Sequence, residues 1–145
     1  MENLFKNAWF VIPARQGSKG VKHKNRILLD YTIGQIPVSL MKKVIITTDD
    51  DSICQRVEDT SIRVVRRPPE LAGDEIDIKR VMLHVIKTLQ LPETDNIIML
   101  YLVWPERTFE KVEEIYKLYL SKQLDSLLCS TPSESHPYMT FYARS

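Results

Sequence analysis

The sequence predicts an α/β fold in three layers, in which helices cover both faces of a mainly parallel β-sheet. Short apolar runs without polar alternation recur along the chain, as expected for strands that are buried on both faces. Segments with helical periodicity separate these runs, so strand and helix alternate. Because ligands bind at the carboxyl ends of strands in such sheets, functional residues are expected in the loops that follow them.

The first strand is expected over residues 8–12, an apolar run that a proline ends. A loop over residues 14–25 follows this strand. Residues 27–40 predict only a short, poorly formed helix, because Gly34 and Pro37 interrupt its apolar pattern.

The middle of the chain predicts two further strands and two helices. The β-branched run at residues 44–46 ends in Thr-Thr-Asp, and the acidic residues after it suit the N-cap of a helix over residues 52–59. Residues 62–65 repeat the strand pattern. A proline-bearing loop then ends at Asp74, the expected N-cap of a core-facing helix whose apolar positions begin at Ile78.

The last part of the chain predicts a buried strand over residues 96–102, a helix that Thr108 opens, and a strand over residues 126–129. Residues 133–145 show no clear periodicity. No helix or strand is therefore predicted at the end of the sequence.

The composition fits one globular domain over residues 1–145 and disfavours several classes of protein. With 43% hydrophobic residues the chain can bury a single core, and 20 basic against 19 acidic residues give a net charge of +1, so no global field favours nucleic acid or a membrane. No apolar run is long enough to span a bilayer, and residues 1–7 lack the apolar core of a signal peptide. We expect a cytoplasmic protein whose two thiols, Cys54 and Cys129, are reduced and structural.

The loop after the first expected strand concentrates positive charge. Residues 3–29 contain six Lys or Arg residues and no acid. The loop also holds Gln16-Gly17-Ser18, where glycine lets backbone amides approach an anion closely. A triphosphate requires both cations and close amides, whereas the alternative interpretation is an ordinary solvated surface loop. Neither the P-loop spacing nor the dinucleotide fingerprint is present.

Four stretches in a fixed order resemble the acylneuraminate cytidylyltransferase family. The first is Val-Ile-Pro-Ala-Arg-Gln-Gly-Ser-Lys-Gly at residues 11–20 with Lys24-Asn25 behind it, and the others lie at residues 44–50, 66–74 and 136–138. The resemblance implies a three-layer Rossmann-like nucleotidyltransferase fold with one truncated nucleotide-binding domain. The C-terminal part of the family fold is expected to be absent.

The resemblance also implies transfer of CMP from CTP to a nonulosonic, sialic-type sugar acid, with release of pyrophosphate and with Mg2+ offsetting the phosphate charge. The metal ligands are not identifiable in the sequence, and a homodimer is implied as well. Arg67 has a structural alternative, in which it pairs with Glu70 or Asp74 within its own loop. By the resemblance, the catalytic residues are Arg15 and Lys19, and the nucleotide-binding residues are Ala14, Arg15, Gln16, Gly17, Ser18, Lys19, Lys24, Asn25 and Arg67.

Two segments depart from the family pattern. Residues 101–105, Tyr-Leu-Val-Trp-Pro, replace a Gln-Pro-Thr-Ser-Pro type of segment, which removes hydrogen-bonding partners for the sugar acid. Glu75 and Asp77 stand in a stretch where the family is rich in hydroxyl groups. These changes permit two alternatives: a catalytically inactive relative that binds nucleotide or a protein partner, and a transferase for another nucleotide or sugar acid.

Four other residues that could take part in chemistry have commoner structural interpretations. We interpret Asp49 and Asp50 as residues at the start of a helix rather than metal ligands, because Asp is a preferred N-cap. Tyr101 lies at the end of the core strand expected over residues 96–102, and Trp104 lies just after it. We interpret both as packing residues rather than as rings that stack on a base.

Overall fold

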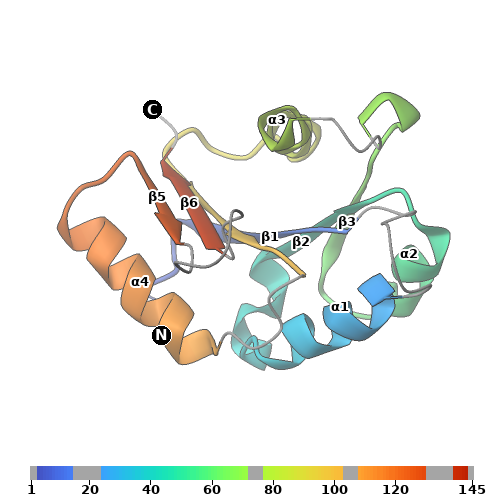
Figure 1. Cartoon of the computed structure of the whole chain (residues 1–145), viewed down its shortest axis with the longest axis horizontal. Helices are drawn as coiled ribbons and strands as arrows, with labels where there is room; N and C mark the ends of the chain where they lie inside the picture. The colour runs from blue at the N-terminus through green and yellow to red at the C-terminus, as the bar shows by residue number, and fades with distance from the viewer. Residues whose placement is uncertain (1–2, 15–23, 72–76, 103–107, 130–138, 144–145) are drawn as a thin grey trace.

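The computed structural model describes residues 3–14, 24–71, 77–102, 108–129 and 139–143. For residues 24–26, 128–129 and 139–143 the description is limited to the backbone. The described residues form the predicted α/β architecture, with helices on both faces of a central sheet (Figure 1).

The sheet has six strands in the order β3-β2-β1-β4-β6-β5. Four of them run parallel: β1 (Ala8–Pro13), β2 (Val44–Thr48), β3 (Arg63–Arg66) and β4 (Asn96–Leu100). The fifth strand, β5 (Ser126–Cys129), is antiparallel to β6 (Met139–Ala143), which in turn is antiparallel to β4. The prediction of a mainly parallel sheet is therefore confirmed.

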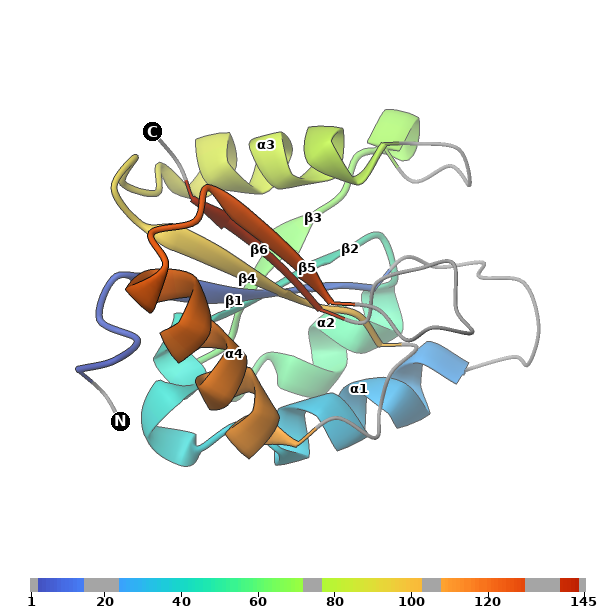
Figure 2. The same cartoon turned by 60° about the vertical axis from the view of Figure 1, so that its left-hand side comes forward.

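The helices divide unequally between the two faces of the sheet (Figures 1 and 2). One face carries α1 (Lys24–Gly34), α2 (Asp51–Val57) and α4 (Phe109–Ser121), whereas α3 (Ile78–Leu89) packs on the other face. Two short 3-10 helices, Val38–Lys43 and Pro69–Leu71, precede β2 and α3. None of the helices in the described residues is long and apolar enough to cross a membrane.

Neighbouring residues of one strand pack into opposite hydrophobic clusters, which explains why the strand sequences do not alternate with polar residues. Phe10 and Ile12 of β1 belong to the cluster beneath α1, α2 and α4, and Val11 between them belongs to the cluster beneath α3. All three side chains are fully buried. Because successive side chains of a strand point to opposite faces, a strand covered on both faces must be apolar throughout.

The structure corrects the prediction for residues 27–40. An uninterrupted helix occupies Lys24–Gly34, and a 3-10 helix starts at Val38, directly after Pro37. Gly34 and Pro37 therefore mark the end of the helix rather than breaks within it, since proline cannot continue an α-helix. Lys24 and Asn25, which we predicted to lie in the loop, form the first turn of α1.

Several other elements differ from the predictions. The N-cap of α3 is Asp77, whose carboxylate accepts a hydrogen bond of 3.0 Å from the backbone N of Lys79, so the prediction of Asp74 is wrong. The β4 strand ends at Leu100, two residues earlier than expected. The β6 strand, which lies between β4 and β5, was not predicted, because strand formation depends on pairing with distant residues more than on local sequence. Thr108 caps α4 as predicted, accepting from the backbone N of Lys111 at 3.2 Å.

A buried polar network joins α4 to the start of β4. The side-chain amide of Asn96 donates to the hydroxyl of Tyr116 at 2.9 Å, and the hydroxyl of Tyr119 donates to the amide oxygen of Asn96 at 3.3 Å. Both tyrosines are almost completely buried. Burial, together with the nearby Tyr116 and Asp125, raises the pKa of Tyr119 to about 12.

The raised pKa of Tyr119 predicts a loss of stability at alkaline pH. Because the pKa in the unfolded chain is about 10, the unfolded state releases this proton first. The contribution of Tyr119 to the free energy of unfolding is therefore fully present below pH about 10. It falls by roughly 2 to 3 kcal/mol as pH rises through 12. When urea unfolding is measured between pH 8 and 12, the free energy of unfolding should decline more steeply with pH for the wild-type protein than for Tyr119→Phe. The lysines that titrate in this range are common to both proteins and affect them equally. An equal dependence of the free energy of unfolding on pH in the two proteins would therefore contradict the prediction.

Candidate nucleotide-binding site

The carboxyl ends of the four parallel strands form the edge where this fold can bind a ligand. Within the order β3-β2-β1-β4, the chain runs outward from β1 to β3 and then returns to β4 on the other side of β1. The loops after β1 and β4 therefore start side by side at the point where strand order reverses. In open α/β sheets, ligands bind in the crevice outside this point.

Ala14 fixes the start of the basic loop against β2. It is the first residue after β1, its side chain is buried, and its backbone N donates to the carbonyl of Thr47 at 2.9 Å. This bond extends the pairing of Pro13 with Thr47 by one residue. The loop therefore leaves the sheet from a defined position directly beside the end of β2. Five of the predicted site residues, Arg15, Gln16, Gly17, Ser18 and Lys19, lie outside the described residues, and their roles stay predictions.

Lys24 and Asn25, two further predicted site residues, begin a helix rather than lying in a loop. The first turn of α1 contains no acidic residue, and it follows the segment that leaves β1. The first turn of a helix carries unpaired backbone N–H groups and a partial positive charge, which favour a bound anion. The side chains of Lys24 and Asn25 lie outside the described atoms, so only their backbone position can be assigned.

Arg67 is a buried cation at the same edge of the sheet. It follows β3 directly and is only 7% exposed. Its backbone N donates to the carbonyl of Thr48 at 2.8 Å, and its Nη2 donates to the carbonyl of Thr47 at 3.3 Å. The guanidinium is therefore held towards the end of β2. A planar guanidinium that is fixed and partly desolvated is well suited to bind a phosphate or a nucleobase edge.

The last two residues of β2 connect the two candidate halves of the site, a role that our sequence analysis did not identify. The carbonyl of Thr47 accepts hydrogen bonds from both Ala14 and Arg67, so one backbone oxygen links the start of the basic loop to the buried arginine. Both Thr47 and Thr48 are fully buried. The signals in the sequence were a pair of hydroxyl residues at the end of an apolar strand and their place in the stretch at residues 44–50 that resembles the family.

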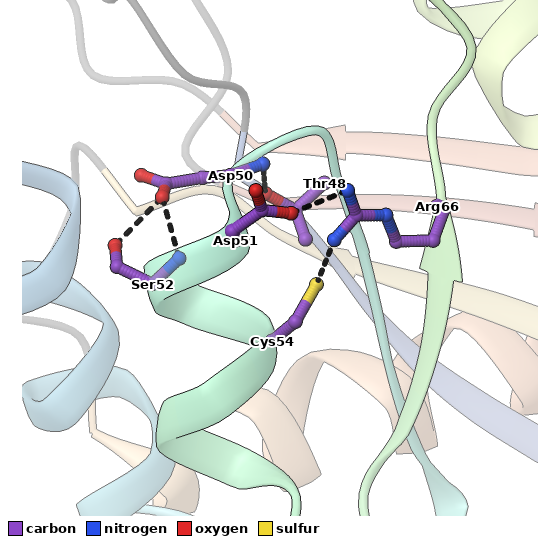
Figure 3. A network of polar contacts seen from close by, with 6 residues as sticks. All are labelled: Thr48, Asp50, Asp51, Ser52, Cys54 and Arg66. Carbon is purple, nitrogen blue, oxygen red and sulfur yellow. Dashed lines mark hydrogen bonds and ion pairs between the residues drawn. The ribbon is translucent and has the colours of Figure 1, made fainter.

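The acidic cluster after β2 has a structural role (Figure 3). One carboxylate oxygen of Asp50 accepts from the backbone N of Ser52 at 2.9 Å and from its hydroxyl at 2.6 Å, so Asp50 is the N-cap of α2. The backbone N of Asp50 donates to the hydroxyl of Thr48 at 3.0 Å. The interpretation of Asp50 as a helix cap is confirmed.

Asp51 and Cys54 complete this network through Arg66. The guanidinium of Arg66 forms an ion pair of 2.5 Å with Asp51 and donates to the sulfur of Cys54 at 3.1 Å (Figure 3). Cys54 is a free, half-buried thiol, and the side chain of Cys129 lies outside the described atoms, so the reduced state of both stays a prediction. Arg66 thus interacts with the start of α2, whereas its neighbour Arg67 interacts with the end of β2.

A pair of substitutions at Asp50 distinguishes a cap from a metal ligand. Asp50→Ala should destabilise the protein by about 1 kcal/mol, because the N-cap acceptor for Ser52 is lost. Asp50→Asn should change stability by only a few tenths of a kcal/mol, because Asn is an equally good cap. Urea unfolding of the two variants measures the difference. Equal, large losses in both would indicate that the negative charge itself matters.

The segment after β4 packs onto the core where it begins. Leu102 is buried in the cluster beneath α1, α2 and α4, and the half-buried ring of Tyr101 packs against the cluster beneath α3. The interpretation of Tyr101 as a packing residue is therefore confirmed. Trp104 lies outside the described residues, as does the His-Pro-Tyr stretch at residues 136–138.

The described residues do not form a metal site of their own. Among them, no three His, Cys, Asp or Glu side chains gather closely enough to hold a cation. Two of the three acids that follow β2, Asp50 and Asp51, interact with Ser52 and Arg66. The residues that would hold the Mg2+ implied by the sequence resemblance are therefore not identified among the described residues.

Comparison of the sequence with known proteins gives a consistent family. A family model described as cytidylyltransferase matches residues 9–101. The N-acylneuraminate cytidylyltransferase of Escherichia coli O18:K1:H7 (strain RS218 / NMEC) is 28% identical over 134 residues. This match covers 88% of the present chain but 32% of the relative, so the chain spans about a third of the length of that protein.

Solved structures show the same fold at lower sequence identity. A cytidylyltransferase from Leptospira borgpetersenii has a TM-score of 0.72 and 18% identity, covering 94% of this chain and 60% of that one. A CMP:2-keto-3-deoxy-manno-octonic acid synthetase complexed with CTP has a TM-score of 0.65 and 18% identity, covering 85% of this chain and 52% of that one. These similarities show the Rossmann-like nucleotidyltransferase fold.

Proposed function

The chain belongs to the cytidylyltransferase family, and we propose that it binds CTP at the carboxyl edge of its parallel strands. We further propose that it transfers CMP to a nonulosonic, sialic-type sugar acid with release of pyrophosphate. The sugar-acid class is inferred from the N-acylneuraminate cytidylyltransferase of E. coli, to which the chain is similar over most of its own length.

The observation that supports the proposal is the shared carbonyl of Thr47. Through it, the first residue of the basic loop and a buried guanidinium are held beside the point where strand order reverses. A triphosphate needs cations from more than one direction because its charge is spread over several oxygens. Arg67 would approach the nucleotide from the β3 side, and the loop with Arg15 and Lys19 would approach it from the β1 side.

The proposed reaction is a displacement at the α-phosphorus of CTP. A hydroxyl oxygen of the sugar acid forms a bond to this phosphorus while the bond to the bridging oxygen of the β-phosphate breaks. Pyrophosphate leaves, and the hydroxyl proton passes to solvent. Catalysis of such a transfer depends mainly on positioning and on stabilising charge. Arg15 and Lys19 would stabilise the negative charge that develops on the leaving pyrophosphate, and no step is assigned to a protein-bound metal.

Isothermal titration calorimetry with CTP, and with ATP as the control, tests the nucleotide half of the proposal. Binding of CTP that is at least tenfold tighter than binding of ATP would support a cytidylyltransferase site. The second half is tested by release of pyrophosphate from CTP in the presence of N-acetylneuraminic acid. Failure to bind either nucleotide would overturn the proposed function.

A second candidate function is binding without turnover. Tyr101 and Leu102 pack into the hydrophobic clusters in the segment where the family resemblance predicts polar groups for the sugar acid. A nucleotide-binding protein that lacks transferase activity, or that binds a protein partner, is consistent with this packing. CTP binding without pyrophosphate release, tested against several nonulosonic acids, would favour this function over the first.

The oligomeric state and the compartment stay predictions of the sequence. A homodimer is proposed from the family resemblance, and light scattering of the purified chain would test it. The cytoplasmic location is proposed from the sequence pattern, and fractionation of the source cells would test it.

A further inference from the structure

Thr47 has a buried hydroxyl group for which the described residues supply no hydrogen-bond partner. The residue is fully buried at the carboxyl end of β2, and its Oγ1 has no hydrogen-bond partner among the described residues. Thr48, the next residue, is equally buried, but its hydroxyl accepts from the backbone N of Asp50. Buried hydroxyls are nearly always paired, because an unpaired one loses its hydrogen bonds to water without compensation.

The position of this hydroxyl connects it to the nucleotide site. Thr47 lies between Pro13 of β1 and Val65 of β3 in the sheet, and its own carbonyl holds both Ala14 and Arg67. By strand alternation, its side chain points to the face that carries α3, as Ile45 does. An apolar valine would fill the same space at this strand position and would fit a buried β-strand better.

We propose that Thr47 is a positioning residue of the nucleotide site, whose hydroxyl forms its hydrogen bond when CTP binds. The inference rests on the proposed function. In the absence of CTP the hydroxyl lowers the stability of the fold, and in the complex it stabilises the arrangement of the loop start and Arg67 around the nucleotide. A polar group that is destabilising until its ligand is present is typical of a functional site rather than of a core.

Thr32 provides a matched control within the same chain. Its Oγ1 is also buried without a hydrogen-bond partner among the described residues. Thr32 lies near the end of α1, about 12 Å along the helix axis from Lys24, so it is remote from the strand edge. Replacing either threonine by valine removes one unpaired hydroxyl and keeps the shape of the side chain.

The test compares Thr47→Val, Thr32→Val and Thr47→Ser in two measurements. Without nucleotide, both valine variants should raise the melting temperature by about 2 to 6 °C, because a buried unpaired hydroxyl is removed. In calorimetry with CTP, Thr47→Val should bind about tenfold more weakly or worse, since it loses a hydrogen bond on the ligand side. Thr32→Val and Thr47→Ser should bind like the wild type.

Three outcomes would overturn the inference. If Thr47→Val binds CTP as tightly as the wild type does, the hydroxyl has no part in the site, while the proposed function stands. If Thr47→Val lowers the melting temperature, the hydroxyl is paired within the fold and its role is structural. If the wild-type protein does not bind CTP at all, the proposed function fails first and this inference fails with it.

Discussion

Replacing Arg67 by alanine is expected to weaken the binding of CTP by about 10- to 100-fold, the range for losing a hydrogen bond to a charged group. The guanidinium is buried and oriented by the carbonyl of Thr47, so solvent screens its interaction with an anionic ligand less than it would at an exposed site. Calorimetry of the purified variant with CTP measures the effect, and circular dichroism checks that the variant is folded.

Arg66→Ala is the matched control for this prediction. Arg66 and Arg67 are adjacent and carry the same charge, but Arg66 is exposed and interacts with Asp51 and Cys54 on α2. Its removal should change CTP affinity by less than about threefold, because an exposed charge is screened by water and salt. Equal losses in the two variants would mean that only net charge matters, and an unchanged affinity in Arg67→Ala would remove Arg67 from the site.

Arg67→Lys separates charge from shape. Lysine keeps the positive charge but lacks the planar fork of donors that can hold the Thr47 carbonyl and a ligand at once. We expect this variant to recover only part of the affinity that alanine loses. Full recovery by lysine would indicate that Arg67 acts as a point charge.

The strands and caps of this protein could be predicted because their signals are local. The runs at residues 8–12 of β1 and 44–46 of β2 are continuously apolar, as two covered faces favour, and Thr108 lies directly before the apolar face of α4. By contrast, β6 exists because it pairs with β4 and β5, which depends on residues far away in the sequence. The N-cap of α3 was predicted at the wrong acid because Asp74 and Asp77 satisfy the same residue preference, and only Asp77 immediately precedes the first helical residue.

The sequence predicts a positively charged loop after β1, but not the hydrogen bonds that link the start of this loop to Arg67. The density of lysine and arginine after the first apolar strand predicted an anion-binding loop, whereas Arg67 was singled out by the family resemblance. The orientations of Arg66 and Arg67 could not be predicted, because the strand was expected to end at residue 65, which placed both arginines in the loop, whereas β3 extends to Arg66. The link through the carbonyl of Thr47 was invisible for a simpler reason, since every residue has a backbone oxygen.

The largest effect on stability is expected from Tyr116→Ala. The ring of Tyr116 is almost completely buried between the aromatic rings of Phe5 and Tyr119, with centroid distances of 5.2 Å and 5.9 Å, and its hydroxyl accepts a hydrogen bond from Asn96. Alanine leaves a cavity, removes both ring contacts and removes the acceptor of the Asn96 Nδ2 group, for a total loss of roughly 3 to 5 kcal/mol.

Tyr116→Phe divides this loss into its two causes. It keeps the ring between its neighbours and removes only the hydroxyl, so it should cost about 1 to 2 kcal/mol. Urea unfolding of the wild type and both variants gives the two losses in the free energy of unfolding. The dependence of this free energy on urea concentration is taken as common to all three proteins. Because the network joins α4 to the start of β4, at the end of the sheet opposite the candidate site, neither variant should change CTP affinity when it is measured well below its unfolding transition. A loss of affinity in Tyr116→Phe would instead mean that the packing of α4 controls the geometry of the strand edge.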